Sequence, residues 1–230
     1  MPRDIFHQEL DQLVEEVLEL SREVEFCLDV MVNALETHDA EAASNKLGVD
    51  ARYKEREAQI VEECMILQAR QAPVAKDLRL IHVVQAVTNH LVRIGTLCEH
   101  ICRGITETRE AERDPDLANT LVEMAHIARD LFRRSLDVFK SRDVERSIEL
   151  EAADDRVDLM YSEGMNLAVN PGDKERAGSP NWRVQAALTV HYLERIADHS
   201  RHQGANRVPS HRRAYGGCFA RIPRAAVGRI

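Results

Sequence analysis

The sequence predicts an all-α protein made of two tandem three-helix bundles, each of them one copy of an internal repeat. The chain has 230 residues, of which 44% are hydrophobic but only 4% aromatic, and it has few glycines and prolines. This composition favours helices and argues against an all-β sandwich or barrel. Apolar residues recur every three or four positions, which is the period of an amphipathic helix. Matching segments about 100 residues apart indicate the repeat.

The first half of the chain is predicted to form three helices. Apolar residues recur at helical spacing from Leu10 to Leu35. Asp39 offers an N-cap for a second helix, and Pro73 precedes a third. The expected helices cover about 4–37, 39–69 and 74–108.

The second half shows the same number of helix signals. Asp114 followed by Pro115 is an N-cap with proline at the first helical position, and Ser179 followed by Pro180 is a second such start. Ser141 and Asp143 are the predicted start of the helix between them, and Asn170-Pro171-Gly172 ends it. The expected helices begin near 115, 143 and 180, and the last two end near 169 and 200.

The repeat is read from constant offsets between equivalent residues. Asp39 and Asp50 have counterparts 104 positions later, and Arg93 has one 102 positions later. Such agreement over about 55 residues indicates duplication of one up-down-up unit whose copies each bury their own apolar stripe and pack side by side. The predicted divisions are 1–110 for the first repeat, 111–200 for the second and 201–230 for a tail.

Charge is distributed unevenly along the chain. The net charge is −8, but residues 201–230 contain seven arginines and no acidic residue, so residues 1–200 carry −15. An acidic body argues against a protein that binds nucleic acid by neutralising phosphates. The basic tail is predicted to be disordered; it either binds anionic lipid or nucleic acid or has no role.

Several absences suggest a compartment. The five cysteines include no CxxC pair, and the first residues contain no apolar signal-peptide region. No apolar stretch of membrane-spanning length occurs. We therefore expect a cytoplasmic protein, and peripheral association with the inner face of the membrane is left open.

Two pairs of acidic residues in the second repeat are candidate metal ligands. Asp154 and Asp158 are spaced i, i+4 on one predicted helix, and Glu194 and Asp198 are spaced i, i+4 on the next. Each pair lies on one helical face, where like charges repel. Four facing carboxylates are favourable only with a cation between them, and oxygen ligands of this kind suit Fe, Mn or Zn. His199 points about 100° away from Asp198 and is not expected to be a ligand.

The first repeat does not keep this pattern. Lys54 stands where the second repeat has Asp158, and Val92 and Thr96 replace its second acidic pair. The lysine supplies a positive charge where a metal would otherwise be needed, so we expect no metal here, or weak binding. The remaining ligand candidates in this half are Asp50, Glu57, His90 and His100, and His90 and Arg93 are expected at a solvated helix edge.

Two other functions are compatible with these residues. Glu123-x-x-His126 is half of a di-iron signature, which would suit a ferritin-like carboxylate-bridged metalloenzyme, although a second such motif is missing. A helical scaffold without metal is the other possibility. The sequence contains no Gly-rich phosphate loop, GxSxG or HExxH motif, so no catalytic residue is predicted.

Three segments carry a resemblance to a known family. They are FHQEL near the N-terminus, QAPVAKDLRLI (71–81) and LERIADH (193–199). With their colinear spacing over about 4–200, they resemble the PhoU family of phosphate-signalling regulators. The resemblance implies two three-helix bundles with metal clusters held by E(D)xxxD motifs. It also implies a non-enzymatic cytoplasmic protein, a homodimer, that restrains a phosphate ABC transporter and a sensor histidine kinase when phosphate is plentiful.

The resemblance supports the same site residues and has two departures. Asp154, Asp158, Glu194 and Asp198 match the acidic motifs of the second repeat, whereas only Asp50 and Glu57 match in the first. After Ser200 the chain reads RHQGANRVPSHRRAYGG instead of continuing the family's helix. A divergent tail and a change of reading frame in the gene both explain this second departure.

Overall fold

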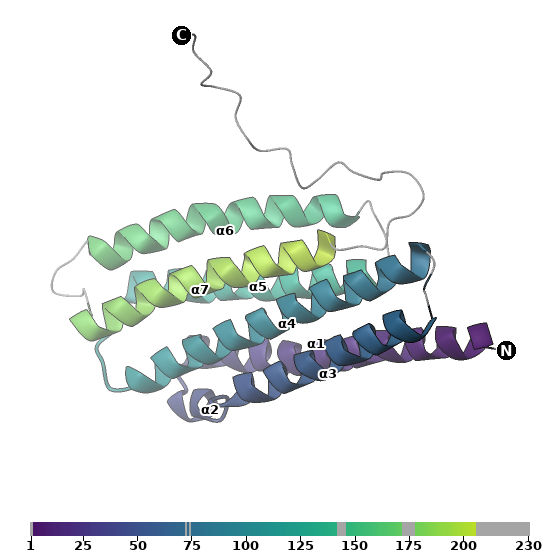
Figure 1. Ribbon diagram of the computed structural model, residues 1–230. Coiled ribbons are helices and arrows are strands. Elements are labelled where there is room, and N and C mark those ends of the chain that lie inside the picture. Colours follow the sequence, from purple (N-terminus) through teal and green to yellow (C-terminus); the bar gives the residue numbers. More distant parts are fainter. Residues whose placement is uncertain (1, 72, 74, 142–145, 172–177, 206–230) are drawn as a thin grey trace, which may run out of the picture.

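The structure is a computed structural model that describes residues 2–71, 73, 75–141, 146–171 and 178–205. In these ranges every regular element is an α-helix (Figure 1). The helices are α1 (Pro2–Thr37), α2 (Ala40–Ser44), α3 (Val49–Gln71), α4 (Ala75–Glu107), α5 (Pro115–Ser141), α6 (Arg146–Val169) and α7 (Pro180–Ala205). The predicted all-α class is confirmed.

Three of the predicted helix starts have the expected caps. Asp39 and Asp114 each accept a hydrogen bond, at 2.9 and 3.1 Å, from the backbone N–H three residues further on. The Ser179 hydroxyl accepts one from the N–H of Trp182 at 3.3 Å. Each bond satisfies a donor that the first helical turn leaves unpaired. Of the predicted start at Ser141 and Asp143, Ser141 is instead the last residue of α5, and Asp143 belongs to residues 142–145, which lie outside the described part.

Two predicted boundaries are wrong. The helix expected over 39–69 is divided into α2 and α3, because the chain turns at Gly48, whose φ of 87° is left-handed and suits glycine. The last helix does not end near Ser200 but continues to Ala205. The first five residues of the predicted disordered tail are therefore helical, while residues 206–230 lie outside the described part.

The helices form two three-helix bundles, as predicted. Helices α1, α3 and α4 pack together with the short α2, and α5, α6 and α7 form the second bundle. The bundles meet where α4 packs on α7 and α1 packs on α5 (Figure 1). Helices α3 and α6 each contact only their own bundle and lie on opposite outer sides of the molecule.

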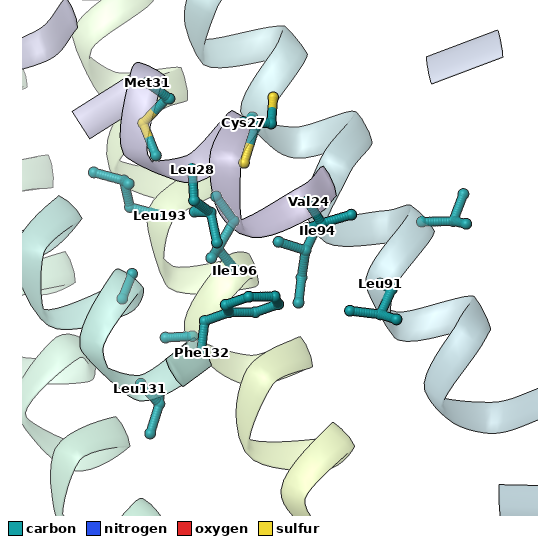
Figure 2. Packing of buried hydrophobic residues seen from close by; sticks show 14 of the residues in the cluster. Val24, Cys27, Leu28, Met31, Leu91, Ile94, Leu131, Phe132, Leu193 and Ile196 are labelled. Atoms are coloured by element: carbon teal, nitrogen blue, oxygen red, sulfur yellow. The ribbon is translucent and has the colours of Figure 1, made fainter. Parts of the chain in front are cut away.

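The apolar core does not divide between the bundles. Buried side chains of both bundles belong to one cluster, so the expectation that each repeat buries its own stripe is wrong. Figure 2 shows Phe132 of α5 lying among Ile94 of α4, Leu28 of α1 and Ile196 of α7. All four are fully buried. The inner helices α1, α4, α5 and α7 thus share one core.

Four of the five cysteines lie in this core. Cys27, Cys64, Cys98 and Cys102 are buried free thiols, which agrees with the absence of a disulfide framework. Burial raises the pKa of both Cys64 and Cys102 to about 12. Along the described helices, no segment is both long and apolar enough to cross a membrane.

Gly95 allows a close contact between α3 and α4. A Cβ atom built on Gly95 would lie 2.5 Å from the ring of Tyr53, which is buried under α4. The same test at Gly104, on the same helix, meets only the end of the Gln185 side chain at 3.2 Å. The first contact has no room for a methyl group, whereas Gln185 can rotate away.

We expect Gly95→Ala to lower stability by about 1–3 kcal/mol through overpacking, even though alanine is the better helix former. Gly104→Ala is the matched control and should be neutral or gain a few tenths of a kcal/mol. Urea unfolding followed by circular dichroism measures both. Equal stability of the two variants would show that Tyr53 can move at no cost.

Three histidines lie where α4 meets α7. Nδ1 of His90 is 3.1 Å from Nδ1 of His199, so one ring donates and the other accepts, and the His202 ring stacks on His90 at a centroid distance of 6.0 Å. Burial and, to a smaller extent, the nearby His199 and His202 together lower the pKa of His90 to about 4. The prediction that His90 lies at a solvated edge is wrong, while Arg93 is exposed as predicted.

This contact should make stability depend on pH. The pKa of His90 is about 4 in the fold against 6.5 for an ordinary histidine, so the fold holds the neutral ring. Its contribution is complete above about pH 6.5 and is lost as the pH falls towards 4. For the partner His199, burial lowers the pKa most, Arg195, His202 and Arg93 lower it as well, and Asp198 raises it.

We therefore expect the melting temperature of His90→Gln to fall less than that of the parent between pH 7.5 and pH 5. The two decreases should differ by about 2–4 °C. Exposed His82, on the same helix, provides the control variant His82→Gln, which should follow the parent. Differential scanning fluorimetry at the two pH values is sufficient. Parallel curves for all three proteins would mean that His90 is protonated without cost.

Candidate functional site

The four acidic residues predicted in the second repeat lie along the seam between two adjacent helices. Asp154 and Asp158 belong to α6, and Glu194 and Asp198 belong to the neighbouring α7. We call these four residues the second carboxylate cluster. Its innermost member is Asp154, whose side chain is 13% exposed. The four predicted residues thus lie on adjacent helices, as their spacing indicated.

The carboxylates of this cluster act on one another. Burial raises the pKa of Asp154, and the charges of Asp198 and Asp158 raise it further. Burial also raises the pKa of Glu194, and the carboxylates of Asp198, Asp158 and Asp154 add to it, against a lowering effect of Arg195. Burial is the main cause of both raised pKa values, and repulsion among the carboxylates adds to it, so a nearby cation would favour the ionised forms.

One cation within the protein contacts the cluster. Arg201 forms a close ion pair with Asp154 across the seam, and its second nitrogen lies 3.4 Å from Oδ1 of Asp198. The guanidinium lowers the pKa of Asp154 and so partly offsets the burial. Sequence reasoning missed Arg201 because it assigned residue 201 to a disordered tail. The i, i+3 spacing from Asp198 was the signal that could have revealed it.

The residue types of the second carboxylate cluster suit a metal ion, but the present positions of their side chains do not. Its oxygen donors and raised pKa values favour a bound cation. Nowhere in the described ranges, however, do three His, Cys, Asp or Glu side chains converge closely enough to hold a metal ion. Arg201 lies against two of the four carboxylates instead. Metal binding at this cluster would therefore require Arg201 to move.

The corresponding seam of the first bundle carries its own cation. Nζ of Lys54 is 2.5 Å from Oδ2 of Asp50, and the Thr96 hydroxyl donates a close hydrogen bond to Oδ1. Burial raises the pKa of Asp50, but the hydrogen bonds from Lys54 and Thr96 outweigh it and hold this pKa below its ordinary value. The lysine takes the role that the sequence predicted for it.

The other first-repeat candidates do not join Asp50. Glu57 is two helical turns away and accepts a hydrogen bond from the side chain of Asn89 at 3.0 Å. His90 contacts His199, and the His100 ring lies against Tyr192 of α7 at 5.3 Å. These histidines contact the second bundle, and His100 also helps to lower the pKa of Asp50.

Glu99 is a hydrogen-bond partner of the Asp50 backbone that sequence reasoning missed. Its buried carboxylate accepts a hydrogen bond from the backbone N–H of Asp50 at 3.0 Å, at the start of α3. It also accepts one from Arg103 at 2.8 Å. An acidic side chain at a helix N-terminus accepts a hydrogen bond from a free backbone N–H and interacts favourably with the helix dipole. No local pattern pairs Glu99 with α3, because 49 residues separate it from Asp50.

The half di-iron motif is not assembled as a metal site. Glu123 forms a close ion pair with Arg156, and His126 lies 3.8 Å from Glu36 and within hydrogen-bonding distance of Arg129. Their neighbours in the structure are therefore cations and one distant carboxylate. This motif therefore gives the ferritin-like alternative no support.

A known protein domain matches each of the two repeats found in the sequence. The PhoU domain model matches the chain twice, at residues 17–105 and 121–204. A phosphate-specific transport system accessory protein PhoU homolog of Pseudomonas aeruginosa is 30% identical over 200 residues, covering 85% of this chain and 81% of the relative. The corresponding homolog of Clostridium acetobutylicum is 27% identical, covering 86% and 90%.

Solved structures show the same architecture. The crystal structure of PhoU from Pseudomonas aeruginosa superposes with a TM-score of 0.78 at 25% identity, covering 87% of this chain and 96% of that one. The phosphate transport system regulatory protein PhoU from Streptococcus pneumoniae gives a TM-score of 0.77 at 21% identity, which supports the fold. With both repeats matched and the fold shared, the chain belongs to the PhoU family.

Proposed function

We propose that this protein is a non-enzymatic accessory regulator of a phosphate-specific transport system. The observation that carries the proposal is the double match to the PhoU domain, which covers both bundles. Relatives that carry the name of such an accessory protein match most of the chain, including those of Pseudomonas aeruginosa and Escherichia coli. The function of such a protein is to change the activity of another protein, which requires a docking surface and no catalytic pocket.

The proposed partners are the phosphate ABC transporter and a sensor histidine kinase, reached from the cytoplasmic face of the membrane. In this proposal the protein restrains uptake and starvation signalling when phosphate is plentiful. The charge of −15 on residues 1–200 supports docking on basic partner regions, because complementary charge speeds encounter and fixes orientation. A homodimer is part of the same proposal.

We also propose that the second carboxylate cluster binds a metal ion, with Fe, Mn or Zn as candidates. Asp154, Asp158, Glu194 and Asp198 would hold it, and it would neutralise charge that the protein's own residues leave uncompensated. Support comes from the raised pKa values of Asp154 and Glu194. In the first seam Asp50 has a lowered pKa and a lysine partner, and Glu57 lies apart; weak binding or none is proposed there.

Deleting the gene should derepress phosphate uptake and the expression of phosphate-starvation genes under phosphate-rich growth. Radiolabelled phosphate uptake and a reporter of a starvation promoter measure the two effects. Complementation with the parent gene should restore repression. Unchanged uptake and reporter activity in the deletion strain would contradict the proposed function.

Metal binding is tested separately by titrating chelator-treated protein with Mn²⁺, Zn²⁺ and Fe²⁺. We expect the parent to bind and Asp154→Ala/Glu194→Ala to lose binding, because two of the four donors are gone. Asp50→Ala/Glu57→Ala is the matched control and should bind as the parent does. Removing metal from the parent should lower its melting temperature by a few degrees, corresponding to about 1–2 kcal/mol. Equal binding by all three proteins would place the metal elsewhere.

A further inference from the structure

We propose that Arg201 is the resident counter-cation of the second carboxylate cluster, which a metal ion must displace in order to bind. The inference concerns the same site as the metal proposal above and rests on that proposal for its second half. Its first half, that Arg201 neutralises the cluster in the metal-free protein, stands independently on the ion pairs of Arg201. The two halves predict different measurements.

The position of Arg201 supports the first half. Its side chain is 30% exposed and reaches across the seam from α7 to Asp154 on α6, which is 13% exposed. It also lies 3.4 Å from Asp198, one turn earlier on its own helix. A partly buried ion pair is weakly screened by water, and removing one partner leaves an uncompensated charge. Arg201 therefore joins the two helices electrostatically.

The two repeats differ in how their acidic residues are compensated by a cation. Equivalent positions are Asp50, Lys54, Val92, Thr96 and Glu99 in the first repeat and Asp154, Asp158, Glu194, Asp198 and Arg201 in the second. The net charge of these five positions is −1 in the first set and −3 in the second. Each set contains one cation, but at a different position.

This difference leaves more uncompensated negative charge in the second seam. Lys54 lies 2.5 Å from Asp50, and positions 92 and 96 carry no acidic side chain, whereas Arg201 is the one cation among four carboxylates in the second set. One guanidinium leaves an excess of negative charge in the second seam, which a divalent ion could neutralise further. Because Arg201 and the metal would use the same Asp154 and Asp198 oxygens, they compete.

The test compares the full-length parent with Arg201→Gln, Arg201→Lys and Arg103→Gln. Arg103 is the matched control because it pairs with Glu99 in the first bundle, outside the second seam. Melting temperature in the presence of a chelator measures the first half of the inference. Isothermal titration of chelator-treated protein with Mn²⁺ measures the second half.

In chelator, we expect Arg201→Gln to melt several degrees below the parent, with Arg201→Lys recovering part of the loss. Arg103→Gln should also melt lower, because it leaves the buried Glu99 without its cation, so it controls for lost stability in the binding measurement. On titration, Arg201→Gln should bind Mn²⁺ about tenfold or more tightly than the parent, as expected if a cationic competitor is removed. Its melting temperature should also rise more on adding Mn²⁺ than that of the parent. Arg103→Gln should bind like the parent.

The outcomes separate this inference from the metal proposal. If no protein binds metal but Arg201→Gln is destabilised in chelator and Arg201→Lys recovers part of the loss, the metal proposal fails and Arg201 is the cluster's permanent cation. If the parent and Arg201→Gln bind Mn²⁺ equally, displacement is wrong and the metal proposal stands. If Arg201→Gln melts like the parent in chelator, Arg201 is not the counter-cation and the inference is overturned.

Discussion

The apolar contact among the four inner helices is the constraint on which the rest of the structure depends. Because α1, α4, α5 and α7 share one core, neither bundle closes on itself, and the two repeats cannot separate without exposing residues such as Phe132 and Ile196. Helices α3 and α6 are left on the outside, each packed on its own bundle. Exposed apolar area of this kind is costly in water, so the core fixes the relation of the two halves.

This arrangement determines where the polar chemistry can lie. An outer helix packed on an inner one forms a seam, and the charged groups lie in the seam between α3 and α4 and in the seam between α6 and α7. Asp50 meets Thr96 in the first seam, and Asp154 meets Arg201 in the second. Helix α7 takes part in two contacts at once. His199 contacts α4, while Asp198, the preceding residue, pairs with Arg201, which reaches Asp154 on α6. Its last turns therefore link the shared core to the charged seam.

Sequence reasoning predicted much of this because the signals were local or repeated. The helix starts at Asp114 and Ser179 follow from capping chemistry, and the facing acidic pairs follow from i, i+4 spacing and the duplicated unit. Other features depend on contacts between distant residues. Glu99 caps α3 from 49 residues away, and His90 meets His199 from 109 residues away. The shared core was also missed, because an apolar stripe does not reveal which helix will cover it.

Arg201 illustrates the largest gap between sequence and structure. Loss of acidic residues after Ser200 suggested that the ordered chain ends there, but α7 continues to Ala205 and Gln203 and Gly204 are buried in it. A residue that seemed to belong to a basic tail thus becomes a partner of Asp154. The carboxylates were predictable from their spacing, whereas the identity of their cation depended on how far the helix continues.

The central claim is that the second carboxylate cluster is held by a cation, with Arg201 in that role when no metal is bound. A pair of crystal structures, one grown with chelator and one with Mn²⁺ and anomalous diffraction data, tests it most directly. The account predicts Arg201 on Asp154 in the first crystal. In the second it predicts an anomalous peak among the four carboxylates, with Arg201 turned away. An Arg201 side chain directed into solvent in the chelated crystal, with the carboxylates unaccompanied, would contradict it.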